Sequence, residues 1–273
     1  MNGKLYIVAT PIGNLEDITL RALKILKEVD IIAAEDTRQT LKLLNHFEIS
    51  KPLISYHRHN EEVKSNILIE KLKQGENIAL VSDAGTPGIC DPGEEVIKKA
   101  IEEKIEVIPI PGACAMINAL IASGLNTSEF SFLGFLPLNK KLRKEKIEEI
   151  KKSKKTIIIY EAPHKMKNTL EDLKEILHDR KIVLARELTK IHEEFIRINI
   201  NELLENINNI KGEMILIIEG DKFEKNEENE LNYLSLEEHY DYYKKQGFNK
   251  KDIIKKIAKD KNVNKNEIYM KFI

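Results

Sequence analysis

Short hydrophobic runs alternate with longer stretches of mixed hydrophobic and polar positions over the first part of the chain. The short runs are typical of buried strands, because a strand covered by helices on both faces of its sheet has few polar positions. The longer stretches have the spacing of amphipathic helices. This pattern predicts strands near residues 4–9, 29–34, 53–56, 78–81 and 106–110, and helices near 18–27, 38–46, 61–74, 93–104 and 113–124. Strands that alternate with helices indicate βαβ units and a mostly parallel α/β sheet.

A second series of strands and helices begins near Phe130. Its pattern predicts strands at about 130–135, 156–161, 182–186, 193–198 and 213–219, and helices at about 139–153, 164–178 and 201–209. We therefore expect two α/β domains, the first over residues 1–117 and the second over residues 118–221.

The C-terminal part of the chain has a different pattern. Residues 222–232 are polar and show no period, which predicts a linker that we place at 222–234. Three short helices are expected after it, within 235–246, 250–259 and 265–272, and they make up a small helical segment over 235–273. A helix-turn-helix-like appendage of this size commonly contacts nucleic acid or another partner, and simple packing is the alternative.

Composition places the chain among folded globular proteins, because 42% of its 273 residues are hydrophobic. No hydrophobic run approaches the roughly 18 residues that a membrane span needs, and no secretory leader pattern precedes the first strand. We therefore expect a cytoplasmic protein with no membrane partner. Cys90 and Cys114 lack the spacing of a disulfide framework or a zinc knuckle, so no metal is expected from them.

The net charge is only −1, which argues against a protein held on nucleic acid by its overall charge. The basic residues are nevertheless concentrated in two segments. Residues 140–155 hold nine Lys or Arg against three Glu, and residues 244–273 hold ten Lys against three acids. These segments are candidates for contact with RNA, and the alternative is that they are ordinary solvated helix faces.

The most informative segment runs from Ser82 to Gly93, where glycines and prolines directly follow a predicted buried strand. Glycine permits positive φ and close approach of a ligand to the main chain, and ligands of open α/β sheets lie beyond the carboxyl ends of the strands. We therefore expect a cofactor at this loop. Asp91 and Pro92 have the pattern of an N-cap and a first-turn proline of the next helix, with a functional role for Asp91 as the alternative.

Two further loops follow predicted strands in the same way, at residues 10–14 and 111–113. The three loops could converge on one cleft. The chain has neither a GxGxxG nor a GxxxxGK[ST] motif, so a dinucleotide site and a P-loop are disfavoured.

Charged residues follow the second and third predicted strands. Glu35, Asp36 and Arg38 come directly after strand 29–34, where they either position a substrate or cofactor, or form a helix cap at Asp36 with a salt bridge. After strand 53–56, the sequence offers imidazoles, a guanidinium and an amide, a set that suits binding of a phosphate or ribose. These residues are His57, Arg58, His59 and Asn60, and Asn60 could also cap the next helix. A metal site at the two histidines lacks further ligands at suitable spacing.

In the second domain, mixed charge follows two hydrophobic strands, at residues 160–165 and 185–190. A purely structural interpretation pairs Arg186 with Glu161 or Glu187. Loss of one partner would then leave a partly buried charge uncompensated.

The chain resembles the ribosomal RNA small subunit methyltransferase I family in several of these segments. They are ATPIGNLEDITLRA, AAEDTR, SYHRHNE, VSDAGTPGICDPG, PGACA, GFLP, YEAPHK and ARELTK. The resemblance is nearly continuous from residue 5 to about 220, and the lysine-rich residues 250–269 resemble the C-terminal segment of that family.

This resemblance implies the tetrapyrrole-methylase fold, in which two α/β domains enclose S-adenosylmethionine in a cleft. It also implies methyl transfer to the ribose 2'-hydroxyl of a cytidine in the decoding centre of small-subunit ribosomal RNA. The partner would be that RNA or the assembled small ribosomal subunit, and a homodimer is expected.

The resemblance also implies which residues line the cofactor pocket. They are Pro11, Gly13, Ser82, Asp83, Ala84, Gly85, Gly112, Ala113, Cys114 and Ala115 in the first domain, and Pro137, Glu161 and Ala185 in the second. Cys90 stands where serine is common in the family, and residues 113–114 stand where proline and serine are frequent; a pocket built from main chain tolerates both changes. The loop ATPIGNLED differs from the glycine-rich GxGPGD loop of the porphyrin and corrin methylases, which disfavours that branch.

Methyl transfer to a ribose hydroxyl requires alignment of the reactants and a group that accepts the hydroxyl proton. The candidate bases are Glu35, Asp36, His57 and Glu187, and the sequence does not choose among them. Contacts to the RNA are expected from Arg38, Arg58, His59, Asn60, Arg186 and Lys190. Two other functions remain as alternatives, namely methylation of a small tetrapyrrole-like acceptor and non-catalytic sensing of the cofactor.

Overall fold

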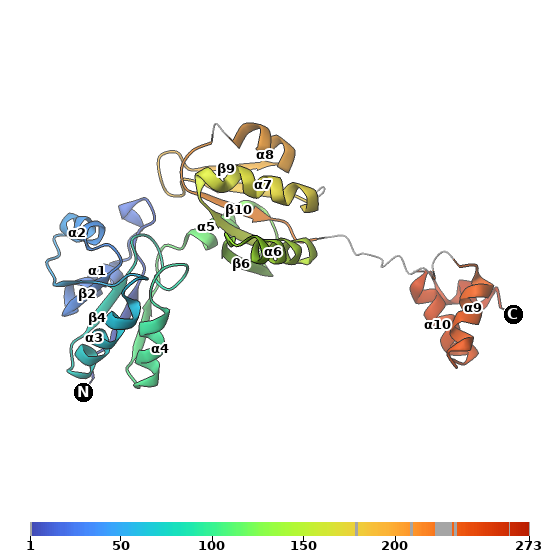
Figure 1. Ribbon diagram of the computed structural model, residues 1–273, viewed down its shortest axis with the longest axis horizontal. Coiled ribbons are helices and arrows are strands. Elements are labelled where there is room, and N and C mark those ends of the chain that lie inside the picture. Colours follow the sequence, from blue (N-terminus) through green and yellow to red (C-terminus); the bar gives the residue numbers. More distant parts are fainter. Residues whose placement is uncertain are drawn as a thin grey trace. The chain divides into compact units, whose positions relative to one another are not determined.

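The computed structural model describes residues 2–177, 180–207, 210–221, 231, 234–261 and 263–272 (Figure 1). The chain divides into two compact units, Met1–Gly220 and Asp221–Ile273. The first unit contains both predicted α/β regions, and the second contains the predicted C-terminal helices. The predicted linker, 222–234, lies outside the described residues except for residues 231 and 234. The proposed domain division at residue 117 falls within a helix and stays a prediction.

The first sheet is parallel throughout. Its strands are β1 (Leu5–Val8), β2 (Ile31–Ala34), β3 (Leu53–Ser55), β4 (Ile78–Val81) and β5 (Val107–Ile110), in the order β3-β2-β4-β1-β5. All of them lie where the hydrophobic runs predict strands. β2 and β4 are buried at every residue, because helices cover both faces of this sheet.

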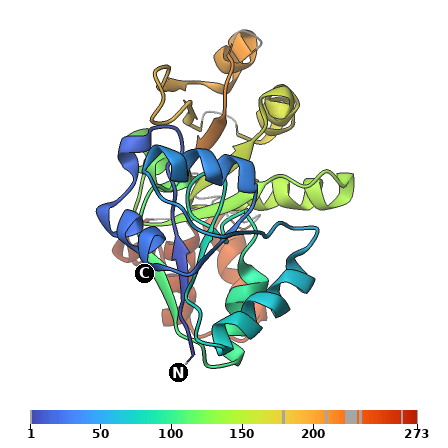
Figure 2. The same ribbon diagram turned by 90° about the vertical axis from the view of Figure 1, so that its left-hand side faces the viewer.

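Helices α1 (Leu20–Glu28) and α2 (Thr37–His46) cover one face of the first sheet, and α3 (Glu61–Lys73) and α4 (Glu94–Glu102) cover the other (Figures 1 and 2). A short 3-10 helix, Leu15–Asp17, precedes α1. β1 therefore leads to a helix on one face, and its neighbour β4 leads to a helix on the opposite face. Loops that diverge in this way leave a crevice beyond the carboxyl ends of the two strands, where open α/β sheets usually bind ligands.

A second sheet follows helix α5 (Ala115–Ser123). Its strands are β6 (Phe130–Phe135), β7 (Thr156–Glu161), β8 (Ile182–Arg186), β9 (Glu194–Ile198) and β10 (Met214–Ile218), in the order β6-β7-β10-β8-β9. β6 and β7 are parallel, and the other neighbouring pairs are antiparallel. The sequence predicts these strands and the α/β class. Hydrophobic runs do not reveal that the second sheet contains both parallel and antiparallel strand pairs.

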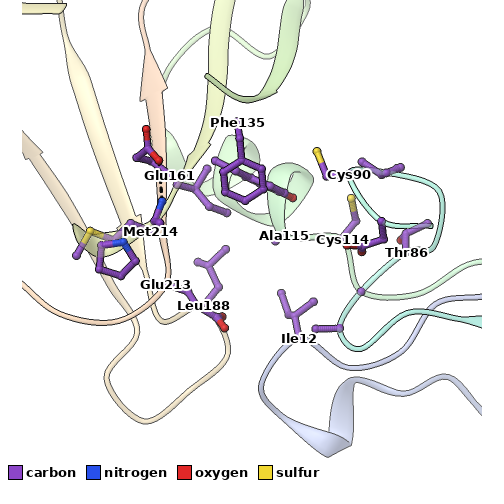
Figure 3. A pocket seen from close by; sticks show the side chains of 18 residues that line it. Ile12, Thr86, Cys90, Cys114, Ala115, Phe135, Glu161, Leu188, Glu213 and Met214 are labelled. Atoms are coloured by element: carbon purple, nitrogen blue, oxygen red, sulfur yellow. Dashed lines mark hydrogen bonds between the residues drawn. The ribbon is translucent and has the colours of Figure 1, made fainter. Parts of the chain in front are cut away.

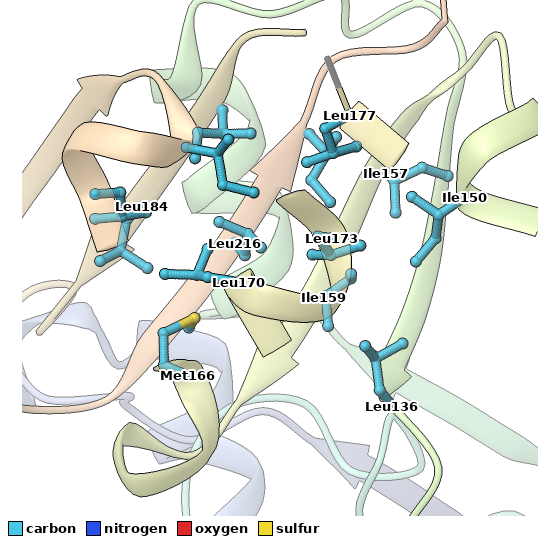
Figure 4. Close-up of a cluster of buried hydrophobic side chains, with 14 of the residues drawn as sticks. Leu136, Ile150, Ile157, Ile159, Met166, Leu170, Leu173, Leu177, Leu184 and Leu216 are labelled. Atoms are coloured by element: carbon cyan, nitrogen blue, oxygen red, sulfur yellow. The ribbon is translucent and has the colours of Figure 1, made fainter. Parts of the chain in front are cut away.

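Helices α6 (Lys140–Lys152), α7 (Pro163–Leu177) and α8 (Ile200–Asn206) pack on one face of the second sheet, and α5 packs on the other. Ile157 and Ile159 of β7 belong to the core beneath α6, α7 and α8, which Figure 4 shows, whereas Ile158 belongs to the core beneath α5. Alternate residues of a strand point to opposite faces, so one unbroken hydrophobic run contributes to both cores.

The C-terminal unit contains helices α9 (Leu236–Lys245), α10 (Lys250–Asp260) and α11 (Lys265–Tyr269). Ser235 and Glu238 form a capping box at the start of α9. Side chains of all these helices, among them Tyr243, Ile257 and Ile268, form a hydrophobic core of their own. The predicted helical appendage is therefore a packed unit.

One predicted helix boundary is wrong. The sequence suggests Asp91 as an N-cap, but α4 begins at Glu94 with Gly93 as its N-cap. Gly93 has a φ of 151°, and its N–H donates a hydrogen bond to Glu61 Oε1 over 3.0 Å. Glycine adopts this conformation readily, so the chain enters the helix later than predicted and the Asp91 carboxylate does not cap it.

None of the described helices is both long enough and hydrophobic enough to cross a lipid bilayer. The described residues contain no cluster of three or more His, Cys, Asp or Glu side chains that could hold a metal ion.

Candidate functional site

The three predicted ligand loops meet beyond the carboxyl ends of β1, β4 and β5. Thr10 and Gly85 exchange two main-chain hydrogen bonds, with N···O distances of 2.8 and 3.0 Å. The Thr86 hydroxyl donates to the carbonyl oxygen of Ala113 over 3.1 Å, and the Thr10 hydroxyl donates to the carbonyl oxygen of Ser82 over 3.2 Å. These contacts confirm that the loops converge, as the sequence suggests.

A cavity of about 430 Å³ lies where these loops face the second sheet (Figure 3). Residues from the loops of the first sheet form one side, including Ile12, Thr86, Cys90 and Cys114. The opposite side is formed by residues of the second sheet and its loops, which we call the second half of the first unit. They include Phe135, Glu161, Leu188 and Met214. Ligand sites in proteins are typically concave, mostly apolar and roughly 300–1,000 Å³ in volume, so this cavity has the dimensions of a nucleoside site.

Two paired strands carry part of the wall from the second sheet. β7 and β10 are antiparallel, and their register places Tyr160 opposite Ile215 and Glu161 opposite Met214. All of these residues line the cavity. This wall is therefore fixed by a hydrogen-bonded ladder, whereas the opposite wall consists mainly of loops.

The loop after β1 touches the loop after β8. A Cβ atom at Gly13 would stand 2.6 Å from Lys190 Cγ, 2.8 Å from Thr189 Oγ1 and 3.0 Å from the carbonyl oxygen of Leu188. Distances this short leave no room for a side chain, so the close approach of the two loops requires glycine. Leu188 lines the cavity, and this contact therefore helps to fix both of its walls.

Tyr160 connects the second sheet to the start of α5. Its hydroxyl oxygen accepts a hydrogen bond from the N–H of Met116 over 3.0 Å. The ring packs edge-on against Phe132 and Phe135, with centroid distances of 4.8 and 5.8 Å. Burial raises the pKa of Tyr160 far above its ordinary value, so the phenol stays neutral.

Glu161 lines the cavity with only 5% of its surface exposed, and both of its carboxylate oxygens have partners. Oε1 accepts a hydrogen bond from the N–H of Ala162 over 2.9 Å, and Oε2 accepts one from the Thr169 hydroxyl over 2.6 Å. The predicted pairing of Arg186 with Glu161 or Glu187 is wrong. Arg186 instead donates to Glu194 Oε2 over 2.7 Å, because β9 lies beside β8 and places these residues opposite each other.

Part of the predicted cofactor set lines the cavity. These residues are Ala84, Gly85, Cys114, Ala115 and Glu161. The remaining predicted residues lie outside the lining and are Pro11, Gly13, Ser82, Asp83, Gly112, Ala113, Pro137 and Ala185. Several of these hold the loops in place. A Cβ atom at Gly112 would stand 2.8 Å from Ala9 Cβ, for example, so glycine brings the loop after β5 close to β1. Direct contact of these residues with a cofactor stays a prediction.

Three carboxylates, which we call the acidic cluster, gather beside the cavity: Glu35 after β2, Asp83 after β4, and Asp91 in the loop that leads to α4. The N–H of Asp83 donates to Glu35 Oε2 over 3.4 Å. Arg58 follows β3 and donates a hydrogen bond to the carbonyl oxygen of Cys90. Asp91 is the member of this cluster that also lines the cavity.

Asp91 and Glu35 of the acidic cluster have raised pKa values, so they hold their protons more tightly than isolated carboxylates do. The pKa of Asp91 is raised to about 6, chiefly by burial and then by the negative charge of Glu35, while Arg58 acts in the opposite direction. Burial likewise raises the pKa of Glu35, and the charge of Asp83 adds to this effect.

The four predicted bases, Glu35, Asp36, His57 and Glu187, lie outside the cavity lining. Asp36 is the N-cap of α2 and accepts a hydrogen bond from the N–H of Arg38 over 2.8 Å. It also forms an ion pair with Arg38 over 2.7 Å, which is the structural alternative that the sequence leaves open. These hydrogen bonds from Arg38 lower the pKa of Asp36 to about 2, so this carboxylate is a weak proton acceptor.

Residues His57 to Asn60 form a turn before α3. Asn60 occupies the N-cap position, but its side chain makes no capping hydrogen bond. Instead, Asn60 Oδ1 accepts from the N–H of His57 over 2.8 Å, and Nδ2 donates to the Ser55 carbonyl over 3.3 Å. Arg58 and His59 are exposed on this turn, where they are available to a ligand.

Glu187 and Lys190 form a small network at the other edge of the second half. Glu187 Oε1 accepts hydrogen bonds from the N–H of Glu213 over 2.9 Å and from Lys190 Nζ over 3.2 Å. Lys190 also donates to Glu213 Oε2 over 3.0 Å. The bond from the Glu213 N–H is the main cause of the lowered pKa of Glu187. The roles of these residues in catalysis and RNA binding stay predictions.

Sequence reasoning named Asp91, which lines the cavity, only as an alternative to an N-cap, and it missed several other lining residues. Tyr160 and Leu188 lie within segments that it singled out, so their position next to predicted residues was an available signal. Glu213 directly precedes β10, and residues 214 and 215 begin this strand, whose hydrophobic run carries no mark of a ligand site. The register of β10 against β7, which single-sequence patterns do not give, brings them to the cavity.

Sequence comparison identifies relatives over most of the chain. Residues 4–204 match the family Tetrapyrrole (Corrin/Porphyrin) Methylases. The ribosomal RNA small subunit methyltransferase I of Halalkalibacterium halodurans is 53% identical over 271 residues, which cover 98% of this chain and 93% of the relative. The enzyme of that name from Thermotoga maritima is 44% identical over 220 residues, which cover 80% of this chain and 99% of the relative.

Solved structures with the same fold have low sequence identity. The methyltransferase CobJ has a TM-score of 0.62 at 16% identity, with 80% of this chain and 94% of that chain covered. Uroporphyrin-III C-methyltransferase from Thermus thermophilus, complexed with S-adenosyl homocysteine, has a TM-score of 0.58 at 16% identity, with 80% of this chain and 97% of that chain covered. At this identity, the likeness establishes the fold.

Proposed function

Because the chain belongs to the tetrapyrrole methylase family, within its branch of ribosomal RNA small subunit methyltransferases I, we propose that it methylates small-subunit ribosomal RNA. The chain is an S-adenosylmethionine-dependent methyltransferase. S-adenosylmethionine, when bound, supplies an electrophilic methyl group. The observation that carries the proposed RNA substrate is the near-full-length similarity to the ribosomal RNA enzymes, which extends through both sheets.

The cavity between the two sheets fits this cofactor. Its volume of about 430 Å³ suits a nucleoside with an amino acid side chain, and its lining is mostly hydrophobic. The bend at Gly85, with a φ of 84°, brings main chain to the lining. Ile12, Leu188 and Ile215 would enclose the apolar parts of the ligand, whereas main-chain groups of the loops would meet its polar groups.

We propose the ribose 2'-hydroxyl of a cytidine in the decoding centre as the methyl acceptor. Support comes from the motif segments and from basic groups next to the acidic cluster. Arg58 and His59 are exposed at the turn after β3, where a phosphate could bind. The first loop lacks the GxGPGD pattern of the porphyrin and corrin branch, which favours RNA over a small tetrapyrrole acceptor. A homodimer in the cytoplasm remains part of the proposal.

The direct test is methyl transfer from radiolabelled S-adenosylmethionine to small ribosomal subunits of a strain that lacks the enzyme. Naked small-subunit RNA and a tetrapyrrole precursor serve as parallel acceptors, and the labelled nucleotide is then mapped. We expect one labelled cytidine ribose. Label in the tetrapyrrole alone would support the small-acceptor alternative. Cofactor binding without transfer to any acceptor would support a sensing protein.

We further propose that the C-terminal unit increases the affinity for RNA but takes no part in methyl transfer. The Thermotoga maritima relative matches over nearly all of its own length without a counterpart for about a fifth of this chain. Truncation after Asp221 should therefore leave cofactor affinity unchanged, weaken RNA binding and reduce its salt dependence, since fewer lysines meet phosphates. An unchanged salt dependence would contradict this role.

A further inference from the structure

We propose that Asp91 is the catalytic base, which accepts the proton of the acceptor ribose hydroxyl during methyl transfer. This inference rests on the proposed function and adds a residue that touches the reacting atoms. It arises from the position of Asp91 in the cavity lining and from the comparison of Asp91 with every other ionisable lining group.

Asp91 lies where two features of the site meet. Its side chain lines the cavity between the two sheets, and it belongs to the acidic cluster beyond β2 and β4. The exposed groups Arg58 and His59 are on the neighbouring turn after β3. Arg58 of this turn donates a hydrogen bond to the carbonyl oxygen of Cys90, the residue before Asp91. The proposed RNA-binding turn and the cavity-lining carboxylate are therefore connected by a direct contact.

Asp91 accepts a hydrogen bond from the neutral Ser82 hydroxyl, whereas the other carboxylates of the lining have two hydrogen-bond donors or a cationic partner. Glu161 accepts hydrogen bonds on both oxygens, from the Ala162 N–H over 2.9 Å and the Thr169 hydroxyl over 2.6 Å. Glu213 pairs with Lys190 over 3.0 Å, and its side chain is 79% exposed. A base must lose no strong partner when it takes up a proton, so neither residue suits the role.

The remaining ionisable groups of the lining are a phenol and two thiols, Tyr160, Cys90 and Cys114. Burial raises the pKa values of Tyr160 and Cys90 above their ordinary alkaline values, so both stay protonated near neutral pH and cannot accept a proton. Cys114 is a thiol as well, and a thiol is a weak acceptor unless it is ionised. Asp91 is therefore the group whose chemistry matches the need.

Its surroundings also match the need. The titratable and charged groups around Asp91 are Glu35, Arg58, Asp83, Cys90 and Tyr160. Burial and the two carboxylates raise the pKa of Asp91 to about 6, while Arg58 and a hydrogen bond from the Ser82 hydroxyl limit the rise. A carboxyl with this pKa is mostly ionised at neutral pH and is a stronger base than an ordinary aspartate.

The proposed step balances in atoms and charge. The ribose oxygen forms a bond to the methyl carbon as the carbon–sulfur bond breaks, and the pair of electrons from that bond stays on sulfur as a neutral thioether. The hydroxyl proton passes to a carboxylate oxygen of Asp91 and leaves to solvent after the product departs. The positive charge of the sulfonium is thus matched by the released proton.

The test is the pH dependence of single-turnover methyl transfer to small subunits at saturating S-adenosylmethionine. Wild-type activity should rise with pH through an apparent pKa near 6 and then level off. Asp91→Asn should lower the rate at pH 8 by about a hundredfold or more and remove this rising limb. Asp91→Glu should recover part of the rate and keep the limb. Glu94→Gln, at an exposed carboxylate of the same loop–helix junction, should behave as wild type.

A second readout does not depend on turnover. Carboxyl-carbon NMR of ¹³C-labelled protein, assigned by comparison with Asp91→Asn, should show an aspartate that titrates near pH 6 in the wild type. Calorimetry should show S-adenosylmethionine affinity in Asp91→Asn within about tenfold of wild type.

The inference would be overturned by an Asp91→Asn enzyme that keeps the wild-type rate and pH profile, or by an Asp91 carboxyl that titrates near 4. Both outcomes leave the proposed function intact. A wild-type enzyme that binds the cofactor but transfers no methyl group to ribosomal RNA would instead overturn the proposed function. The two failures are therefore distinguishable.

Discussion

The guanidinium of Arg58 donates a hydrogen bond to the main-chain carbonyl oxygen of Cys90, 32 positions further along the chain. Cys90 has a φ of 65°, in the left-handed region that non-glycine residues seldom adopt. The bond holds this strained bend in the loop that carries Asp91, and it connects the turn after β3 to the cavity. The contact thus joins the proposed RNA side of the site to the cofactor side.

Replacement of Arg58 by alanine should raise the pKa of Asp91 above its wild-type value of about 6, because the positive charge of Arg58 lowers it. Burial and the negative charge of Glu35, which both raise the pKa of Asp91, would then no longer be offset by the charge of Arg58. Carboxyl-carbon NMR over a pH titration measures the change. Arg21→Ala, at an exposed arginine of α1, is the control and should leave the titration unchanged. A lower pKa in Arg58→Ala would contradict this reasoning.

Gly13→Ala should weaken cofactor binding, because the added Cβ would stand 2.6 Å from Lys190 Cγ and 2.8 Å from Thr189 Oγ1. The loops must then separate, at a cost of about 1–3 kcal/mol in stability. Calorimetry and thermal unfolding measure the two effects. Lys190→Ala removes the nearest of these atoms, so the double variant should lose less than the two single variants together. Strict additivity would show that the loops do not touch.

Gly212→Ala should destabilise the second half more than an ordinary glycine substitution does. Gly212 has a φ of 95°, and an added Cβ would stand 2.4 Å from Glu187 Cγ and Cδ. Gly124→Ala is a matched control, since Gly124 has a φ of 79° and nothing within 4 Å of its added Cβ. The control should cost about 1 kcal/mol from backbone strain alone, and Gly212→Ala about 1–3 kcal/mol more. Equal losses in urea unfolding would show that Glu187 moves aside freely.

Asp91→Asn should make the protein more stable at pH 8 and have little effect at pH 4. The folded-state pKa of Asp91 is raised to about 6, so its contribution to stability is present in acid and is lost as the pH rises through that value. The gain at pH 8 should be about 1 kcal/mol after allowance for solvent screening of this half-buried group, or about 2–4 °C in Tm.

Thermal unfolding at the two pH values tests this expectation, with Glu94→Gln as the control. The exposed Glu94 side chain should show no such pH-dependent difference. A variant that is destabilised equally at both pH values would mean that Asp91 stabilises the fold through contacts rather than through its charge.

The hydrophobic pattern predicts the fold well, because the strands of both sheets are built on short hydrophobic runs, which are unbroken in β1, β2, β4 and β10. β4 (Ile78–Val81) begins and ends where its hydrophobic run does, and β7 (Thr156–Glu161) extends one residue beyond its run at each end. The predicted N-cap of α4, Asp91, is wrong. Gly93 supplies both the positive φ and the contact to Glu61 that fix where the helix begins. Composition alone does not show which of several turn-forming residues makes the turn.

The site is only partly predictable for a related reason. Loops that follow parallel strands meet at one sheet edge, and this rule locates Ala84 and Gly85 correctly at the cavity, whereas Cys114 was placed there by the family resemblance. No comparable rule relates the register of one sheet to the loops of another. Residues 213–215 therefore escaped notice, and Arg186 was paired with the wrong carboxylate.

The ladder between Glu161 and Met214 has a dynamic consequence. Amide protons in paired strands exchange slowly with solvent, whereas those of bends held by a few side-chain contacts exchange faster. Ligand binding should therefore slow amide hydrogen exchange almost entirely at residues 84–91, while the amides of β7 and β10 exchange slowly with and without ligand. The enzyme would thus adapt to its ligand from one side only.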